Sequence, residues 1–286
     1  MNGPESDRTF SPKQALVPTP ALYGEIVGDG MEQLAAVSIS CIDPFGTTEA
    51  VVHDVGCGLG AATSAIVASA KSQNVAIKGS DINDDVLEDY RQNIAKNKWP
   101  AEAFKMDASA LDFPDEAFTH SIGSALVFVL PNDSVDAIKE MYRTLKPGGV
   151  AIVNSWAYTP TLPAIHAACK QTRPADTPLP RQGLEKWEEA DVLRDVVIEG
   201  GFSPDNVTLH QKDVHMTIGD LKRFSTMIWS FIAGTTTAGW LESDEEKWDE
   251  AVDAVAEALT LTSGFEKLED GKNKIMFKAN VAVATK

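Results

Sequence analysis

Cysteine is scarce in this 286-residue sequence, which has three cysteines and no Cys-x-x-Cys pair. Any disulfide scheme would leave one of Cys41, Cys57 and Cys169 unpaired. Disulfide frameworks are typical of secreted chains with an even number of cysteines, whereas cytosolic proteins keep their thiols reduced. We therefore predict three free thiols and a cytoplasmic location.

Long apolar runs are also absent. No stretch of the sequence approaches the roughly 20 apolar residues that a helix needs to cross a bilayer. Residues 1–13 are polar and lack the apolar region of a secretory signal. We expect no secretory leader, no membrane anchor and no membrane partner.

Basic residues are outnumbered by acidic ones. The chain has 25 Lys and Arg against 42 Asp and Glu, which gives a formal net charge of −17 at pH 7. Such a surface repels a phosphate backbone, whereas proteins that bind nucleic acids usually carry basic patches. The charge argues against DNA or RNA as a partner and leaves the oligomeric state open.

The remaining composition is that of an ordinary globular protein, with 43% hydrophobic and 23% charged residues. An irregular arm is predicted over Met1–Pro20 and short helices over Ala21–Ile42. After these helices, strands are predicted over Ala50–Val55, Val75–Asp81, Ala101–Met106, Phe118–Ile122, Val150–Trp156, Val207–Lys212 and Ile275–Ala284. Helices are predicted over Ala61–Lys71, Asn83–Lys98, Ser134–Leu145, Leu162–Lys170, Glu188–Glu199, Gly219–Ile232 and Asp244–Leu261. The turn Lys146-Pro147-Gly148-Gly149 ends the helix Ser134–Leu145. Strands that alternate with helices indicate an α/β fold with a parallel sheet covered on both faces.

Polar residues follow three successive strands of this pattern. The first strand ends in Asp54-Val55-Gly56-Cys57-Gly58-Leu59-Gly60, where the glycines let a ligand approach the backbone and the next helix offers free N–H groups. The spacing is G-x-G-x-G with an acid two residues before it, and a dinucleotide site would carry G-x-G-x-x-G. Asp81 ends the second strand, where a carboxylate can accept both hydroxyls of a ribose, and Asp107 follows the third, where an acid can accept from an adenine amino group. Three acids in this order are far more specific than any one of them.

These residues, with the turn Arg143-Thr144-Leu145-Lys146-Pro147-Gly148-Gly149, resemble the class I methyltransferases that use S-adenosylmethionine (SAM). The resemblance covers about residues 49–156 and is closest to the ubiquinone-biosynthesis-type branch. His53-Asp54, Phe118-Thr119-His120-Ser121-Ile122 and Asn154-Ser155-Trp156-Ala157 are similar to fungal natural-product enzymes such as the gliotoxin thiomethyltransferase. The resemblance implies a Rossmann-like sheet of seven mostly parallel strands with an antiparallel last strand and helical cap insertions.

The same resemblance implies SAM as cofactor and assigns its contacts by position. Asp54, Gly56, Cys57, Gly58 and Gly60 would hold the methionine part, Asp81 the ribose and Ile82 one face of the adenine, while Asp107 and Ala108 would read the adenine edge, Ser124 would lie near the transferred methyl and Tyr23 would close over the cofactor. Trp156 and Tyr158 end the fifth strand at the edge where open α/β sheets bind ligands, and they are the predicted substrate contacts. No metal ligands are predicted.

Two features narrow the reaction. Ile122-Gly123-Ser124-Ala125-Leu126 replaces the Asn/Asp-Pro-Pro-Tyr signature of amide and exocyclic-amine methylases, so proteins and nucleic acids are poor candidates for the acceptor. An essential base need not exist, because placing the two reactants together can itself carry methyl transfer, and none is assigned. His166 is the one candidate base, with a surface or packing role as the alternative, and His53 and His120 are interpreted as packing residues.

The sequence therefore predicts a SAM-dependent methyltransferase acting on a small molecule of the secondary-metabolite kind at O, N or S. Residues 1–48 are predicted as an N-terminal lid and residues 49–286 as the SAM-binding domain, with a helical insertion at about 215–265. Two alternatives stay open: a SAM-binding enzyme of another class, such as a cyclase or an eliminating enzyme, and a non-catalytic SAM-binding partner. A dehydrogenase is disfavoured by the loop spacing.

Overall fold

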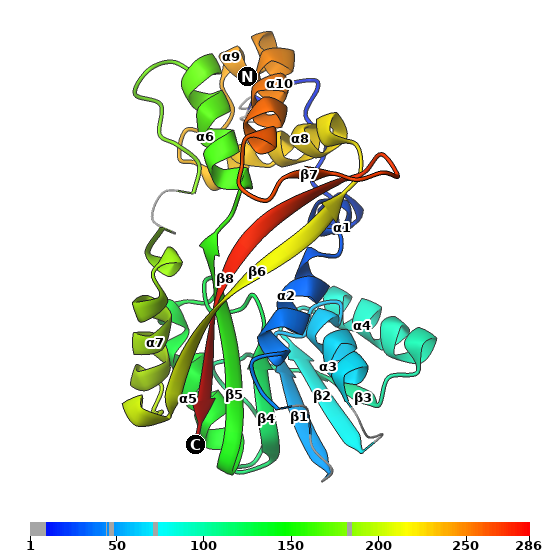
Figure 1. Ribbon diagram of the computed structural model, residues 1–286, viewed down its shortest axis with the longest axis vertical. Coiled ribbons are helices and arrows are strands. Elements are labelled where there is room, and N and C mark those ends of the chain that lie inside the picture. Colours follow the sequence, from blue (N-terminus) through cyan, green and yellow to red (C-terminus); the bar gives the residue numbers. More distant parts are fainter. Residues whose placement is uncertain (1–9, 44, 46–48, 71–73, 182–184) are drawn as a thin grey trace, which may run out of the picture. The chain divides into compact units, whose positions relative to one another are not determined.

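The computed structural model describes residues 10–43, 45, 49–70, 74–181 and 185–286 (Figure 1). The chain divides into two compact units. The sheet unit consists of Asp29–Tyr158, Leu184–Val214 and Phe277–Lys286, and the helical unit of Met1–Gly28, Thr159–Gly183 and His215–Met276.

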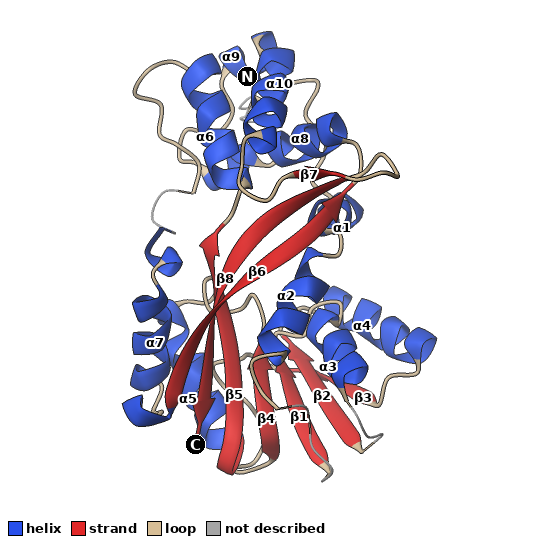
Figure 2. Cartoon of the chain, viewed as in Figure 1, coloured by secondary structure: helices blue, strands red, loops and turns tan. Residues whose placement is uncertain are grey.

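A twisted sheet forms the centre of the sheet unit (Figure 2). The strands of the sheet are β1 (Ala50–Val55), β2 (Val75–Asp81), β3 (Ala101–Lys105), β4 (Phe118–Gly123), β5 (Leu145–Tyr158), β6 (Val207–Ile218), β7 (Glu266–Lys267) and β8 (Asn273–Thr285). Residues 215–218 of β6, residues 273–276 of β8 and the whole of β7 belong to the helical unit. The order is β3-β2-β1-β4-β5-β8-β6, and β7 pairs with β8 off this path. The neighbours from β3 to β5 are parallel, and β8 is antiparallel to β5. The predicted seven-stranded path and its antiparallel last strand are confirmed.

Helices cover both faces of this sheet. They are α2 (Gly30–Ile39), α3 (Ala61–Ser69), α4 (Asp84–Asn97), α5 (Val135–Thr144) and α7 (Ala190–Glu199), with short 3₁₀ turns at Asn132–Ser134, Glu185–Glu188 and Pro204–Asn206. One core joins α5 and α7 to Phe118 and Val153, and the other joins α2 and α3 to Val52 and Ile77. Because β1 is central, its residues are buried almost throughout, as expected for a parallel strand packed on both faces.

The fifth strand differs from its prediction. The helix α5 ends at Thr144 as the turn signal indicates, but β5 begins directly at Leu145 instead of Val150. The reason is a long-range pairing: Leu145 is the register partner of Phe118, and Gly148 and Gly149 exchange backbone hydrogen bonds with Lys286. Pairing with the far end of the chain holds residues 145–149 extended.

Two further differences have the same origin. The strands β6 and β8 extend beyond the ranges predicted from hydrophobic alternation, and the short strand β7 was not predicted. These residues join a strand because a neighbouring strand supplies hydrogen bonds, which alternation within one segment does not reveal.

Within its described residues, the helical unit packs five helices around its own core. They are α1 (Pro20–Val27), α6 (Thr161–Thr172), α8 (Leu221–Ser230), α9 (Glu242–Glu246) and α10 (Trp248–Thr260), with a 3₁₀ turn at Ile232–Thr235. Trp229 and Trp248 are buried in it. Every helix in the described part of the chain is too short or too polar to cross a bilayer.

A wholly buried ion pair lies within the helical unit. The Arg173 guanidinium donates to both carboxylate oxygens of Asp244, from Nε at 2.8 Å and from Nη2 at 2.7 Å, and Nη2 also donates to the Gly239 carbonyl. Both side chains have 0% exposure. The Asp244 carboxylate also accepts from the backbone N–H of Leu241, so the pair joins the end of α6 to the start of α9.

Removing one partner of this pair should be costly. We expect Asp244→Ala to lower the free energy of unfolding by about 3–5 kcal/mol, because it leaves a buried guanidinium without its counter-charge. Denaturant unfolding measures this, with Asp253→Ala as the matched control, since Asp253 forms an exposed ion pair with Lys222 in the same unit and should cost less than about 1 kcal/mol. If the two variants lost equal free energies of unfolding, the prediction that the buried Arg173–Asp244 pair matters more than an exposed pair would be wrong.

The sheet unit contains a buried histidine that should make folding sensitive to pH. His53 on β1 has 0% exposure, stacks on Phe118 at 4.8 Å between ring centroids and lies 2.9 Å from the Ser80 hydroxyl. Burial, and then the charge of Lys78, lowers its pKa to about 3. The position predicted as a packing histidine is therefore neutral in the folded protein at ordinary pH.

The sign of the pH effect follows from that shift. Below pH 6.5 the unfolded chain protonates His53 and the folded chain does not, so the contribution of His53 to stability falls as the pH drops from about 6.5 towards 3, by up to about 5 kcal/mol. The measurement is the free energy of unfolding against pH for the wild type and His53→Phe. The variant should lose less stability than the wild type over this window, and parallel curves would refute the prediction.

Candidate active site

The glycine loop lies between β1 and α3, at the carboxyl edge of the sheet. Gly56, Gly58 and Gly60 have φ angles of +65°, +52° and +97°, in the left-handed region that favours glycine. A Cβ on Gly60 would lie 2.6 Å from the Trp99 ring, so no other residue fits there. The loop therefore exposes its backbone and turns directly into the first turn of α3, whose N-terminus attracts negative charge.

Asp54 lies beneath this loop and is 1% exposed. Its Oδ2 accepts from the backbone N–H of Thr63 at 3.0 Å and from the Thr63 hydroxyl at 2.7 Å, so the carboxylate caps α3 from the end of β1. Burial raises the pKa of Asp54 to about 6, against the opposing effect of the Thr63 hydrogen bonds. If Asp54 helps to hold the methionine end, it therefore does so through its charge and through the shape that it gives the loop, and not by direct contact with the ligand.

Asp81 ends β2 and joins two loops. Its Oδ2 accepts from the backbone N–H of Gly58 at 3.1 Å, and its Oδ1 accepts from the N–H of Asn83 at 3.0 Å. Each oxygen keeps a lone pair, since a carboxylate oxygen can accept two hydrogen bonds. The half-buried carboxylate is thus held in a fixed orientation beside the glycine loop.

Asp107 follows β3 and is exposed. Its Oδ1 accepts from the backbone N–H and the hydroxyl of Ser109, at 2.8 and 2.7 Å, and these bonds lower its pKa. Ala108, beside it, is 9% exposed. Asp107 is therefore ionised at neutral pH and has its side chain turned by the local loop.

Two apolar side chains at this edge are exposed. Ile82, predicted to cover the adenine, is 64% exposed, and Leu59 of the glycine loop is 53% exposed. Large apolar side chains left open beside oriented carboxylates are typical of a site for a ligand with both polar and flat apolar parts.

Ser124 follows β4 at the same edge and is fixed by Asn154 of β5. The Asn154 amide donates to the hydroxyls of Ser124 and Ser38, at 3.2 and 2.9 Å, and its oxygen accepts from the Ala125 backbone N–H at 2.8 Å. Asn154 is completely buried, and Ala125 has a φ of +56°. The asparagine therefore holds a strained turn at the end of β4 and joins it to α2.

The predicted substrate contacts, Trp156 and Tyr158, lie at the end of β5 and are half-buried. The Trp156 ring lies 5.2 Å from that of Phe277 on the neighbouring strand and packs against the core beneath α2 and α3. Burial raises the pKa of Tyr158. Their substrate role stays a prediction.

Tyr23 and His166 belong to the helical unit. Tyr23 lies on α1 and is 56% exposed. His166 on α6 has its Nε2 2.8 Å from the Pro180 carbonyl, and since a carbonyl only accepts, Nδ1 is the nitrogen able to take a proton. Both roles stay predictions. Asp54, Gly56–Gly60, Asp81, Ile82, Asp107, Ala108 and Ser124 all lie at the carboxyl edge of the sheet unit, and their contacts with the cofactor also stay predictions.

Cys57 lies in the loop but its side chain is 4% exposed. Burial raises the pKa of its thiol far above neutrality, and its backbone N–H donates to the Ser80 carbonyl at 2.8 Å. Cys57 therefore supports the loop from below and is not a nucleophile at neutral pH.

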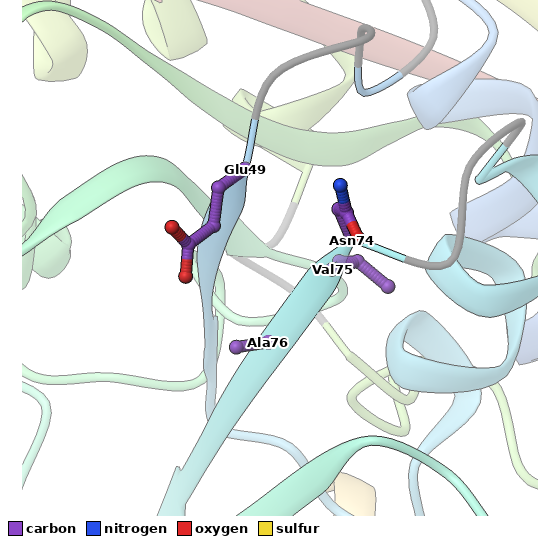
Figure 3. A pocket seen from close by; sticks show the side chains of 4 residues that line it. All are labelled: Glu49, Asn74, Val75 and Ala76. Atoms are coloured by element: carbon purple, nitrogen blue, oxygen red, sulfur yellow. The ribbon is translucent and has the colours of Figure 1, made fainter.

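A surface hollow occurs at the opposite edge of the sheet. It is lined by Glu49, Asn74, Val75 and Ala76, where β1 and β2 begin (Figure 3). Since the two strands are parallel and Ala50 pairs with Val75, this hollow lies at their amino ends. It is therefore not part of the site formed by the glycine loop and the acids.

Sequence reasoning missed three residues that shape this site. Thr63 holds Asp54, Tyr90 contacts Thr63, and Asn154 holds the turn after β4. A hydroxyl residue in the first turn after the glycine loop is a signal for Thr63. Tyr90 and Asn154 give no such signal, because their partners are 27 and 30 residues away.

Comparisons with known proteins agree with this geometry. The family model described as a methyltransferase domain matches residues 52–149. Methyltransferase KtnA of Aspergillus niger is 26% identical over 65% of this chain and 69% of its own length. Carboxy-S-adenosyl-L-methionine synthase of Shewanella loihica is 24% identical over 46% of this chain, and the match spans about half (51%) of that enzyme.

Among solved structures, a putative methyltransferase from Bacillus halodurans has a similar fold. Its TM-score is 0.53 at 17% identity, with 88% of this chain and 97% of that chain covered. The fold, the glycine loop and the three acids agree with these similarities, and residues 52–149 of the chain are a SAM-dependent methyltransferase domain of class I.

Proposed function

We propose that this protein transfers the methyl group of SAM to an oxygen, nitrogen or sulfur atom of a small secondary-metabolite acceptor. The observation that carries the proposal is the Asp81 carboxylate, which is oriented by backbone N–H groups from two loops beside left-handed glycines. The similarity to methyltransferase KtnA supports methyl transfer, and the resemblance of His53-Asp54 and Asn154-Ser155-Trp156-Ala157 to fungal natural-product enzymes supports the type of acceptor.

The residues present fit SAM in shape and charge. Asp81 would hold the ribose hydroxyls, and Ile82 and Leu59 offer exposed apolar surface for the adenine. The carboxylates of Asp54, Asp81 and Asp107 suit a ligand whose sulfonium and ammonium groups are both positive. A dinucleotide would instead bring two phosphates to this acidic loop.

Bound SAM supplies an electrophilic methyl carbon on a positively charged sulfur. With SAM held by Asp81, Ile82 and the glycine loop, a lone pair of the acceptor would form the new bond to that carbon as the carbon–sulfur bond breaks, and the bonding electrons would remain on sulfur in S-adenosylhomocysteine. A hydroxyl or thiol acceptor would give its proton to solvent or to a base. The charge is dispersed in this step, so placement of the two reactants and exclusion of water carry the catalysis.

A second candidate is a SAM-using enzyme of another reaction class. The similarity to a carboxy-S-adenosyl-L-methionine synthase favours it. The mass of the product separates the two reactions.

The cofactor assignment predicts a specific loss in Asp81→Ala. We expect SAM binding, measured by calorimetry, to weaken at least tenfold, because roughly 1.5–3 kcal/mol is lost with each hydrogen bond to a charged group. The matched control is Asp89→Ala, which removes an exposed carboxylate from α4 and should bind SAM as the wild type does.

NADH is the control ligand in the same titration. Binding of NADH without binding of SAM would refute the methyltransferase assignment. Once SAM binding is established, candidate acceptors are incubated with SAM and enzyme, and mass spectrometry should detect a product heavier by one methyl group together with S-adenosylhomocysteine. SAM binding without turnover across acceptor classes would favour a non-catalytic SAM-binding partner.

A further inference from the structure

A chain of hydrogen-bonded hydroxyl groups runs beneath the glycine loop from α4 to β1. The Tyr90 hydroxyl lies 2.7 Å from the Thr63 hydroxyl, which lies 2.7 Å from Asp54 Oδ2. Tyr90 and Thr63 have 0% exposure and Asp54 has 1%. The Tyr90–Thr63–Asp54 chain is therefore sealed from water and can be ordered only by its own members.

The direction of donation in this chain is fixed when Asp54 is ionised. A carboxylate only accepts, so the single hydroxyl proton of Thr63 goes to Asp54. Thr63 must then accept from Tyr90, and the order is Tyr90 to Thr63 to Asp54. Successive hydrogen bonds in a buried chain polarise one another, so the Tyr90 donor strengthens the bond that Thr63 makes to the carboxylate. If Asp54 is protonated, this order is no longer imposed.

The Tyr90 ring occupies space that two glycines, Gly60 and Gly79, leave open. A Cβ on Gly79 would lie 2.4 Å from the Tyr90 ring, and one on Gly60 would lie 2.9 Å from it. Gly79 is the register partner of Asp54 on the neighbouring strand. The two glycines thus admit an aromatic ring whose hydroxyl reaches the first turn of α3.

The charge on Asp54 depends on a balance near neutral pH. Burial raises its pKa to about 6, the two Thr63 bonds lower it, and the nearby Asp81 raises it. Cys57 and Tyr90 also face the carboxyl group, and burial keeps both protonated by raising their pKa values. A change in one hydrogen bond of the chain therefore changes the fraction of Asp54 that is charged.

We infer that Tyr90 is a positioning residue of the cofactor site, which acts through Thr63 to keep the Asp54 carboxylate charged and turned towards α3 while a cationic ligand lies on the glycine loop. This inference rests on the proposed function, because it takes the amino-acid end of SAM as that ligand. Neither Tyr90 nor Thr63 needs to touch SAM: the chain sets the electrostatic potential and the shape of the loop above it.

The test is the pH dependence of SAM binding in Tyr90→Phe. This variant keeps the ring against Gly60 and Gly79 and removes only the hydroxyl. Calorimetric titrations with SAM between pH 5 and pH 8 should show wild-type affinity rising through about pH 6 as Asp54 ionises. In Tyr90→Phe the midpoint should move up by about half a pH unit, which corresponds to about threefold weaker binding at pH 5 and convergence with the wild type by pH 8.

Companion variants separate this role from simple packing. Thr63→Val removes the bond to Asp54 itself and should shift the midpoint further, Thr63→Ser should restore the wild-type profile, and Asp54→Asn should remove the pH step. Tyr142→Phe is the matched control, since Tyr142 lies on α5 and packs against Phe202 on the other face of the sheet. It should leave the profile unchanged.

A second measurement needs no ligand. The titration of the Asp54 carboxyl carbon in the apo protein, followed by NMR and assigned with Asp54→Asn, should show the same upward shift in Tyr90→Phe. If wild type binds SAM but Tyr90→Phe has the wild-type pH profile, or loses affinity equally at every pH, the inference is overturned while the proposed function stands. If wild type binds no SAM at any pH, the cofactor role of the chain fails together with the proposed function.

Discussion

Two hydrogen bonds from Thr63 to one oxygen of Asp54 hold the glycine loop in shape. The loop itself consists largely of residues that pay no steric penalty in many conformations, so its geometry has to be imposed from outside. The carboxylate joins the end of β1 to the first turn of α3 and also places a negative charge at the positive end of that helix. Asp81 also fixes the loop, because its carboxylate accepts a hydrogen bond from the backbone N–H of Gly58. The groups that fix the loop are therefore also the groups that give it an attraction for cations.

The opposite border of the site depends on a different kind of constraint. Asn154 uses both ends of its amide to hold the turn after β4, and through Ser38 it attaches that turn to α2. Because the asparagine is completely buried, each unmade bond would leave an unsatisfied polar group. The turn with its strained Ala125 is thus held by the hydrogen bonds of a buried amide, whereas the glycine loop is held by hydrogen bonds to charged carboxylates.

Much of this architecture was readable from the sequence, because the informative signals are local. The acid and glycines after β1, Asp81 after β2 and Asp107 after β3 each follow a short apolar run, and parallel strands bring such residues to one edge. The beginning of β5 was not readable, since residues 145–149 are extended only through their pairing with Phe118 and Lys286. Tyr90 was missed for a similar reason: its position on α4 indicates a buried face, but nothing nearby in the sequence indicates the hydroxyl that it meets. Nor does the motif alone reveal that the Asp54 carboxylate already accepts two hydrogen bonds from Thr63.

The packing of Tyr90 against Gly60 and Gly79 has a consequence for how this protein can vary. The three positions share one volume, so a methyl group gained at position 79 has to be matched by a smaller ring or none at position 90. Losing the phenol would in turn leave the Thr63 hydroxyl without its donor. Divergence at these positions is therefore concerted: a lineage that exchanges Gly79 for alanine should change residues 90 and 63 with it, and the three should covary as a set among related chains.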